Sequence, residues 1–257
     1  MRAKAKKNEA AVIEIRRVAE EALTFCVVGI SPFVCNAMSA KVRGDLLLPP
    51  QKKNATEKAT TLKHDPMVEY RRSIYRSLGN GAETRIEFPA GGWKRAMASA
   101  ALELPGVRKT QIGRLCWVEG HMLPIFGVPQ IYMAVVRSAD IGRTPDVRTR
   151  AILPEWAARV PVKFVTPNLK RQSVANLLAS AGVFIGVGDG RPEKGALSFG
   201  RFDIVDEDDE RFLRIVTEGG REAQDAALEE PEAFDVETEE LLEWWTAEAH
   251  RRGFEVA

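Results

Sequence analysis

Residues 171–205, RQSVANLLASAGVFIGVGDGRPEKGALSFGRFDIV, predict a helix, a glycine-rich loop and a short strand, in that order. Apolar residues recur at helical spacing between positions 174 and 181, and Gly182 follows them where a helix commonly ends. The apolar residues of positions 202–205 are typical of a strand. The rest of the chain is interpreted around this unit.

The loop of this unit combines glycines with cations: Gly186, Gly188, Gly190, Gly195, Gly200, Arg191, Lys194 and Arg201. Glycine lets a backbone take positive φ and approach a ligand closely, and exposed N–H groups beside cations suit phosphate. A dinucleotide-binding loop is excluded because that motif follows a strand and opens a helix, whereas here the helix comes first. A P-loop is excluded because no G-x-x-x-x-G-K-[ST] occurs. The alternative is a flexible connection between helix and strand, which at fourteen residues is long.

The charges are distributed unevenly. The chain has 257 residues, of which 45% are hydrophobic, so we expect a large folded domain. Residues 1–200 carry 31 Lys and Arg against 17 Asp and Glu, a net +14, whereas residues 201–257 carry 6 against 19, a net −13. A basic body with an acidic tail favours a polyanionic partner such as nucleic acid. The alternative is a solvated basic surface balanced by an acidic helix that packs on it.

The spacing of the cysteines and the length of the apolar runs indicate the cellular compartment of the protein. Cys26, Cys35 and Cys116 are too widely spaced to indicate a disulfide framework or a zinc site, which favours a reducing cytoplasm. No run of eighteen apolar residues occurs, and the basic N-terminus lacks the apolar core of a secretory signal. We therefore expect a cytoplasmic protein with no membrane partner, no metal and no cofactor.

The predicted elements define an α+β fold. Strands over 23–30, 115–127, 156–166 and 200–205, with helices over 92–104 and 171–182, give the order βαββαβ. This is the ferredoxin-like arrangement, which RNA-recognition domains use with their sheet as a platform. Residues 33–88 form a helical insertion, and residues 128–155 form a β-hairpin thumb. Residues 1–205 make one domain, and the acidic tail of residues 206–257 ends in a helix.

Three local predictions concern the insertion and the strands. Residues 33–48 are expected to be helical, and Pro161 is expected to lie at a sheet edge or a bulge. Asp65 is expected to cap a helix over Met67–Leu78, which would place Arg72 beside Arg76, and Arg71 beside Tyr75, at i,i+4 spacing. Arginines interleaved with aromatic residues stack bases and hold phosphates, but an amphipathic helix that covers a core has the same pattern.

The helix predicted over 92–104 begins with cations. Lys94 and Arg95 lie in its first turn, where positive charge opposes the helix dipole. An anion bound at this N-terminus would offset that opposition.

Taken together, these features resemble the repeat-associated mysterious protein (RAMP) superfamily, in particular the backbone subunits of CRISPR effector complexes. The resemblance covers roughly residues 10–205. It rests on the loop GVGDGRPEKGALSFGRF after its helix, on the helix start FPAGGWKRAMASAA, and on the insertion and thumb. It implies subunits that polymerise along single-stranded RNA, with the thumb of one reaching its neighbour. The acidic tail lies outside that pattern and favours a stand-alone, phage-type relative.

The first hypothesis is a non-catalytic protein that binds single-stranded RNA or DNA and assembles along the strand as a homo-oligomer. Binding should then fall steeply with salt. The expected nucleic-acid contacts are Lys41, Arg43, Arg71, Arg72, Arg76, Lys94, Arg95, Arg148, Arg150, Gly186, Gly188, Gly190, Arg191, Lys194 and Arg201.

Two alternatives remain. The second hypothesis is a metal-independent endoribonuclease that uses His64, His121 or Asp45, although nothing in the sequence pairs these residues into an acid–base system and we expect no catalysis. The third is a protein-interaction or inhibitor module whose acidic tail imitates nucleic acid. Deletion of residues 206–257 should discriminate, because it would preserve nucleic-acid binding under the first hypothesis and abolish activity under the third.

Overall fold

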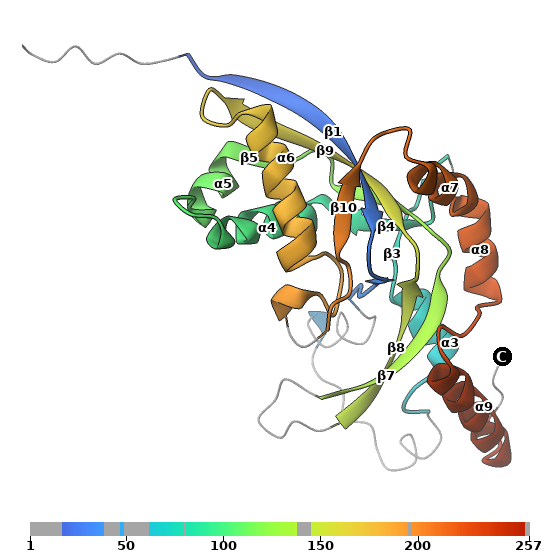
Figure 1. Ribbon diagram of the computed structural model, residues 1–257. Helices are drawn as coiled ribbons and strands as arrows, with labels where there is room; N and C mark the ends of the chain where they lie inside the picture. The colour runs from blue at the N-terminus through green and yellow to red at the C-terminus, as the bar shows by residue number, and fades with distance from the viewer. Residues whose placement is uncertain are drawn as a thin grey trace, which may run out of the picture.

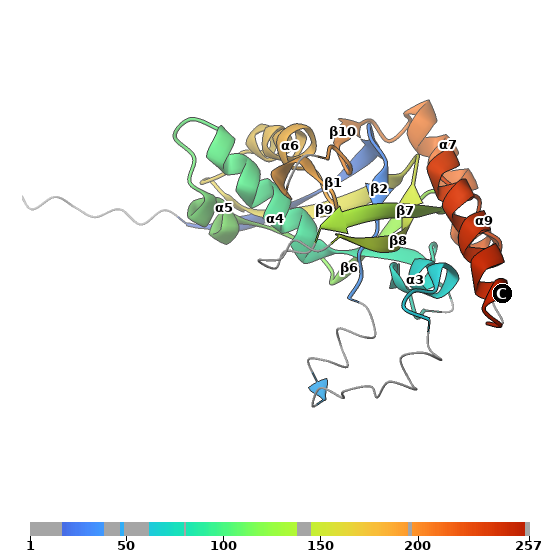
Figure 2. The same ribbon diagram turned by 90° about the horizontal axis from the view of Figure 1, so that it is seen from below.

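The computed structural model describes residues 17–38, 47–48, 62–79, 81–137, 145–194 and 197–254. Two antiparallel sheets and their helices make up these residues (Figures 1 and 2). The larger sheet consists of β1 (Ala19–Gly29), β3 (Tyr75–Arg76), β4 (Ile86–Pro89), β5 (Cys116–Val118), β6 (Met122–Phe126), β9 (Ala157–Thr166) and β10 (Phe202–Val205). The smaller sheet consists of β2 (Phe33–Val34), β7 (Gln130–Arg137) and β8 (Pro145–Leu153).

The strand order of the larger sheet is β10-β1-β9-β6-β4-β3, and β5 also pairs with β9. Since β5 and β6 together occupy the position of one strand, the core runs in the order fourth, first, third, second, with every pairing antiparallel. The helices between these strands are α4 (Ala90–Ala100) and α6 (Arg171–Ser180). The fold is therefore α+β with the ferredoxin-like βαββαβ core that the sequence predicts.

One face of the larger sheet is covered by α4 and α6. Alternate residues of β1 and β9, such as Val27 and Val160, point into this layer and are completely buried. Trp93 of α4, Trp156 and Phe202 stack edge-on or tilted, with ring centroids 5.3–6.2 Å apart, and none of them is exposed. This dry aromatic cluster holds the helices to the sheet.

The thumb is built from the smaller sheet. Strands β7 and β8 pair along their length, and β2 adds to β8. Helix α3 (Pro66–Arg72) lies against the free edge of β8. There Glu69 accepts a hydrogen bond from the Thr149 N–H at 3.3 Å, and Ser73 accepts one from the Ala151 N–H at 2.8 Å. These side chains satisfy edge donors that another strand would otherwise have to pair.

The acidic tail is packed onto the body, as in the docked alternative. It forms α7 (Glu210–Glu218), α8 (Arg221–Glu229) and α9 (Val236–Arg251). Helix α7 covers part of the second face of the larger sheet, where Phe212 and Ile215 bury Cys26 and Phe126. The tail thereby occupies part of the face that RNA-recognition domains use as a platform.

Three local predictions are wrong within the described residues. Positions 33–38 contain the strand β2 and irregular chain rather than a helix. The helix that Asp65 caps ends at Arg72, because Ser73 turns the chain and bonds to the edge of β8. Pro161 lies in β9, a central strand, where its carbonyl accepts from the Glu119 N–H beside the break between β5 and β6. The missing proline N–H therefore falls where the neighbouring strand is interrupted.

Two further observations concern the hydrophobicity of the described helices and the state of the cysteines. No helix among the described residues has the length and apolarity to cross a membrane. Cys26, Cys35 and Cys116 are all buried free thiols, and burial raises the pKa of Cys35 and Cys116, the latter to about 11.

Candidate nucleic-acid interface

The first wall of the candidate site is the start of α4. Strand β4 runs directly into this helix at Pro89, and no side chain caps the helix. The Phe88 ring lies so close to the first turn that a Cβ on Gly92 would approach its Cε1 atom to 2.4 Å. Glycine at this position therefore allows the ring to pack on the helix start. The prediction that Lys94 and Arg95 lie in the first turn is wrong, because α4 begins at Ala90 and both residues fall in its second turn. Arg95 is exposed there.

The second wall is the glycine-rich loop. Helix α6 continues through a π-helical turn, Ala181–Ile185, and ends at Gly186, whose φ is 72°. Gly188 and Gly190 also have positive φ, and a Cβ on Gly188 would lie 2.8 Å from the Val34 carbonyl oxygen. The Asp189 N–H donates to that same carbonyl at 3.0 Å. The loop is thus hydrogen-bonded to β2 along this stretch, which argues against the alternative of a flexible connection.

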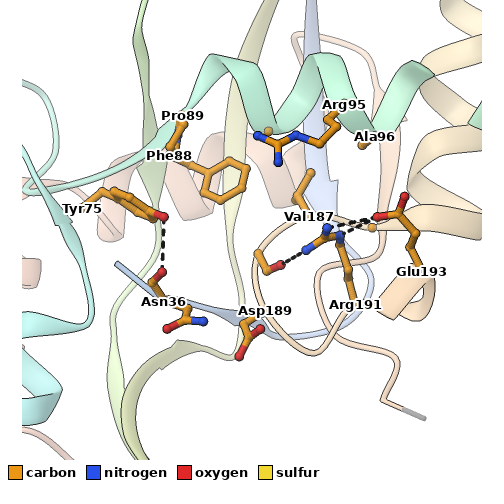
Figure 3. A pocket seen from close by; sticks show the side chains of 13 residues that line it. Asn36, Tyr75, Phe88, Pro89, Arg95, Ala96, Val187, Asp189, Arg191 and Glu193 are labelled. Atoms are coloured by element: carbon orange, nitrogen blue, oxygen red, sulfur yellow. Dashed lines mark hydrogen bonds and ion pairs between the residues drawn. The ribbon is translucent and has the colours of Figure 1, made fainter. Parts of the chain in front are cut away.

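These two walls enclose a cleft of about 190 Å³, which we call the α4–loop cleft (Figure 3). It brings together the helix start and the loop, two motifs that lie about a hundred residues apart in the sequence. Its aromatic side is formed by Tyr75 and Phe88, whose rings meet edge-on at 6.1 Å. Its polar lining is Asn36, Arg95, Asp189, Arg191 and Glu193.

Arg191 is largely engaged within the loop. Its Nη1 donates to the Gly188 carbonyl at 2.9 Å, and its Nε and Nη2 donate to Glu193 at 3.1 and 3.0 Å. Burial would raise the pKa of Glu193, but hydrogen bonds from Ser99 and Arg191 and the nearby cations hold it below the ordinary value. Arg191 therefore fixes the loop, and Glu193 offsets most of its charge.

Arg95 is the cation of the cleft that remains available. No ion pair or hydrogen bond joins its guanidinium to another described residue, and Figure 3 shows it above the cleft on α4. It lies close enough to Tyr75 to influence that phenol, whose pKa burial raises and Arg95 lowers in part. A guanidinium beside an aromatic ring can hold a phosphate while a base stacks on the ring.

The thumb reaches the same cleft through Arg150. This side chain forms an ion pair with Asp189 of the loop and is mostly buried. Arg148, two residues earlier, is half exposed and pairs with Asp146 at 3.3 Å. The structure therefore brings one of the two predicted thumb arginines into contact with Asp189, a residue that lines the cleft.

The other predicted contacts near the loop are more dispersed. Arg201 donates weakly to the Val183 carbonyl at 3.3 Å, and Lys194 is exposed on a 3-10 turn after Arg191. Lys94 is not among the residues that line the cleft, and its charge partly counters the effect of burial on the pKa of the Cys116 thiol.

The arginines of the insertion form a separate group. Because α3 ends at Arg72 and Arg76 lies in β3, the predicted i,i+4 pairs do not form. Arg71 donates to the carbonyls of Leu228 and Glu229 at 2.8 and 3.1 Å, so it holds the end of α8. Arg72 and Arg76 are exposed beside a shallow hollow. Lys41, Arg43 and Asp45 lie outside the described residues.

The histidines proposed for catalysis have defined partners. His64 Nδ1 lies 2.7 Å from Glu69 Oε1, and His64 Nε2 lies 2.9 Å from Asp146 Oδ1. Both ring nitrogens thus face carboxylates of α3 and β8. His121 is exposed in the turn between β5 and β6, where its backbone carbonyl accepts from the Ala90 N–H. Within the described residues no group of three or more His, Cys, Asp or Glu side chains is arranged so that it could hold a metal ion.

Sequence reasoning missed several lining residues. Asn36 falls in a segment expected to be helical, and Tyr75 was expected to lie on a helix. Phe88, Asp189 and Glu193 belong to the quoted motifs but carry no pattern that marks them as lining residues. The two acidic residues of the loop sequence, Asp189 and Glu193, could have indicated carboxylate partners for the arginines, because Arg–carboxylate hydrogen bonds are strong.

Neither a protein-family model nor a curated protein matches the chain. Among solved structures it is similar to Cmr6 from Pyrococcus furiosus, at 10% identity and a TM-score of 0.37, over 73% of this chain and 98% of that one. It is also similar to a chain of the Type III-B Cmr-beta complex bound to cognate target RNA, at 12% identity and a TM-score of 0.34. That match covers 73% of this chain and 59% of the other. At these TM-scores the similarity assigns no function, so the proposals below rest on the residues themselves.

Proposed function

We propose that the protein binds single-stranded nucleic acid without cleaving it, through the α4–loop cleft, and assembles in several copies on the strand as a RAMP-like component of a nucleoprotein complex. The observation that carries the proposal is Arg95, an exposed guanidinium above a cleft lined by Tyr75, Phe88 and glycine backbone. A phosphate contacts the guanidinium of Arg95, and a base stacks on the aromatic side.

The charge around the cleft supports this assignment. Arg150 and Arg191 are offset by Asp189 and Glu193, so they order the cleft more than they attract a polyanion. Arg95 contributes uncompensated charge, and Lys194 on the adjoining turn is exposed. Binding in this arrangement depends on few phosphate contacts per copy. Assembly of several copies on one strand then supplies the remaining affinity by multivalency.

The absence of cleavage is part of the proposal. A general base needs a lone pair that faces the substrate. In His64 both nitrogens face carboxylates within hydrogen-bond distance, so neither is directed at an open site. Incubation with labelled RNA followed by a denaturing gel tests this point. Cleavage that disappears in His64→Ala would establish the endoribonuclease alternative instead.

The binding test compares two charge deletions in the full chain. Arg95→Ala should weaken binding to a labelled single-stranded RNA roughly fivefold and lower the salt slope by about 0.7, the value for one phosphate of a single strand. Arg114→Ala removes an equal charge from the exposed surface of α5 (Lys109–Leu115) and should change both quantities much less. Equal losses in both variants would mean that only net charge matters and that the cleft is not the site.

The inhibitor alternative needs a test other than deletion. Phe212 of the tail is completely buried against the sheet, so removal of residues 206–257 would expose the body and confound the result. Replacement of Asp206, Asp208 and Glu210 by their amides preserves the packing and removes charge. Binding to RNA that holds or rises in this variant supports the proposal, since the tail charge no longer competes.

A further inference from the structure

A second surface, which shares no lining residue with the α4–loop cleft, has no role in the proposed function. It is a groove of about 270 Å³ between α9, the thumb and the chain before α3. Its lining is mainly apolar and includes Met133, Val147, Leu241, Trp244 and Trp245. The cations Lys63 and Arg252 also line it, and they are paired with Asp146 and Glu248. We call it the α9 groove.

The most exposed wall of this groove is aromatic. Trp244 is 65% exposed, although tryptophan is a residue that folded proteins usually bury and that interfaces use as an anchor. Its neighbour Trp245 is partly covered, and Met133 on the thumb is buried beneath the groove. Aromatic residues and methionine together are typical of the centre of a protein interface.

The approach to the groove along α9 is acidic. Glu237, Glu240 and Trp244 follow one another at i, i+3 and i+7, so they lie on one side of the helix, and Glu243 adjoins them. All three glutamates are exposed, and no ion pair joins them to other described residues. At the far end Glu248 is already neutralised by Arg251 and Arg252, at 2.6 Å each. The surface therefore fits a segment with an apolar anchor flanked by cations.

Such a segment occurs in this chain outside the described residues. Residues 1–16, MRAKAKKNEAAVIEIR, carry four Lys and Arg in their first seven positions. The apolar group Val12, Ile13 and Ile15 follows, with Glu14 inside it and Arg16 after it. Strand β1 begins at the end of the molecule opposite to α9 (Figures 1 and 2). Because the segment is joined to the molecule at that opposite end, we place it in the α9 groove of another copy.

We propose that residues 1–16 of one copy occupy the α9 groove of a second copy, with the apolar group against Trp244 and the cations along the glutamates of α9. The contact joins two different surfaces, so repetition of it builds a chain of subunits unless the rotation closes a ring. It does not depend on nucleic acid, and it can fail or hold independently of the α4–loop cleft.

The first test measures the contact with a peptide. A labelled peptide of residues 1–16 is titrated into the full chain carrying K4E/K6E/K7E, whose own segment is inactivated. Saturable binding is expected, with a roughly tenfold loss in Trp244→Ala and in E240K/E243K. E229K/E230K, which makes the same charge change at the end of α8, should have little effect. Equal binding of a peptide with the same composition in shuffled order would overturn the proposal, because the contact would then be charge alone.

The second test measures assembly of the full chain by sedimentation velocity over a range of concentrations. Wild type should associate, whereas K4E/K6E/K7E and E240K/E243K alone should each remain monomeric. A mixture of the two variants contains one intact segment and one intact groove per pair, so it should give dimers and nothing larger. A wild type that stays monomeric at all concentrations, or association that persists in E240K/E243K, would refute occupation of the groove by a second copy. RNA binding measured on the same samples shows whether the proposed function holds regardless.

Discussion

Helix α4 of the βαββαβ core and helix α8 of the tail are both attached to the larger sheet, but by side chains of different chemistry. Trp93, Trp156 and Phe202 hold α4 to the sheet through apolar contact alone, apart from one bond of the Trp156 indole N–H to the Ser31 carbonyl at 2.8 Å. Helix α8 instead inserts Gln224, which is completely buried. The larger sheet therefore packs against an apolar aromatic cluster under α4 and binds the polar side chain of Gln224 near the ends of β4 and β6.

The side-chain amide of Gln224 forms hydrogen bonds with five backbone groups around it. Its Oε1 accepts from the N–H groups of Arg85 and Ile86 at 2.8 and 2.9 Å. Its Nε2 lies within 3.0 Å of the carbonyl oxygens of Ile125, Gly127 and Gly219. The anchor joins β4, β6 and the end of α7 through hydrogen bonds, whereas α4 is held to the sheet by an apolar cluster. This difference predicts that the two regions respond to different perturbations.

The largest expected effect is the loss of core packing. Trp156→Ala removes a fully buried indole and should lower the free energy of unfolding by about 3–5 kcal/mol, since the surroundings collapse only partly into the space. Trp244→Ala removes the same side chain from a position 65% exposed and should change it by less than about 0.5 kcal/mol. Urea unfolding of both variants provides the comparison. Similar losses would show that the core does not have the contacts described.

The next effect is the loss of the polar anchor. Gln224→Leu keeps the volume but leaves two N–H groups and several carbonyls without their partner, at a cost of about 2–3 kcal/mol. Hydrogen exchange should rise first in α8 and in the ends of β4 and β6, while β9 stays protected. Gln172→Leu, on the exposed side of α6, is the matched control. Uniform exchange across the sheet in Gln224→Leu would mean that the tail and core unfold as one unit.

The contrast also explains what the sequence could and could not predict. The core elements were predicted because Val27, Val160 and the residues of α6 follow strand and helix periodicities that burial imposes. The polar anchor was not, because Gln224 in REAQDAALE resembles any exposed helical glutamine. Likewise α3 was extended to Leu78 because the pattern of Tyr70, Ile74 and Leu78 is helical. Ser73 ends that helix by a contact with β8, which is distant in sequence.

In the candidate site, too, the features set by local sequence were predictable and those set by contacts between distant residues were not. The glycines of the loop and the helix start at Pro89 were recognisable, because positive φ and helix initiation are local properties. That Arg191 is neutralised by Glu193, and that Arg95 is not, depends on three-dimensional pairing. The sequence therefore indicates where cations are present but not which of them are available.

Acid should weaken the tail through its ionic contacts. Asp225 of α8 accepts from Arg85 at 2.8 Å, and that hydrogen bond, against the opposing effect of burial, holds the pKa of the carboxyl below its ordinary value. A pKa that is lower in the folded state stabilises above the unfolded value and loses its contribution as the pH falls through the folded value. Asp225→Asn should therefore be less stable than wild type at pH 6, by under about 1 kcal/mol because the pair is partly exposed.

Urea unfolding of wild type and Asp225→Asn at pH 6, 4 and 2 measures this dependence. The difference between the two should shrink below about pH 4, where the wild-type carboxylate begins to take up its proton. A difference that stays constant over this range would show that the substitution acts through packing and that the ion pair contributes nothing.

The smallest expected effect concerns the outer contact of α7. Arg214 forms a two-pronged ion pair with Glu155, at 3.0 and 2.6 Å, and both side chains are well exposed. Because water and salt screen such pairs, Arg214→Gln should cost no more than about 0.5 kcal/mol and should cost nothing measurable in 0.5 M salt. Phe212→Ala on the same helix removes a fully buried ring and should cost several times more at any salt concentration. If Arg214→Gln were the more damaging variant, α7 would be held to the sheet by its charges. Helix α7 would then be attached to the sheet by polar contacts, as α8 is.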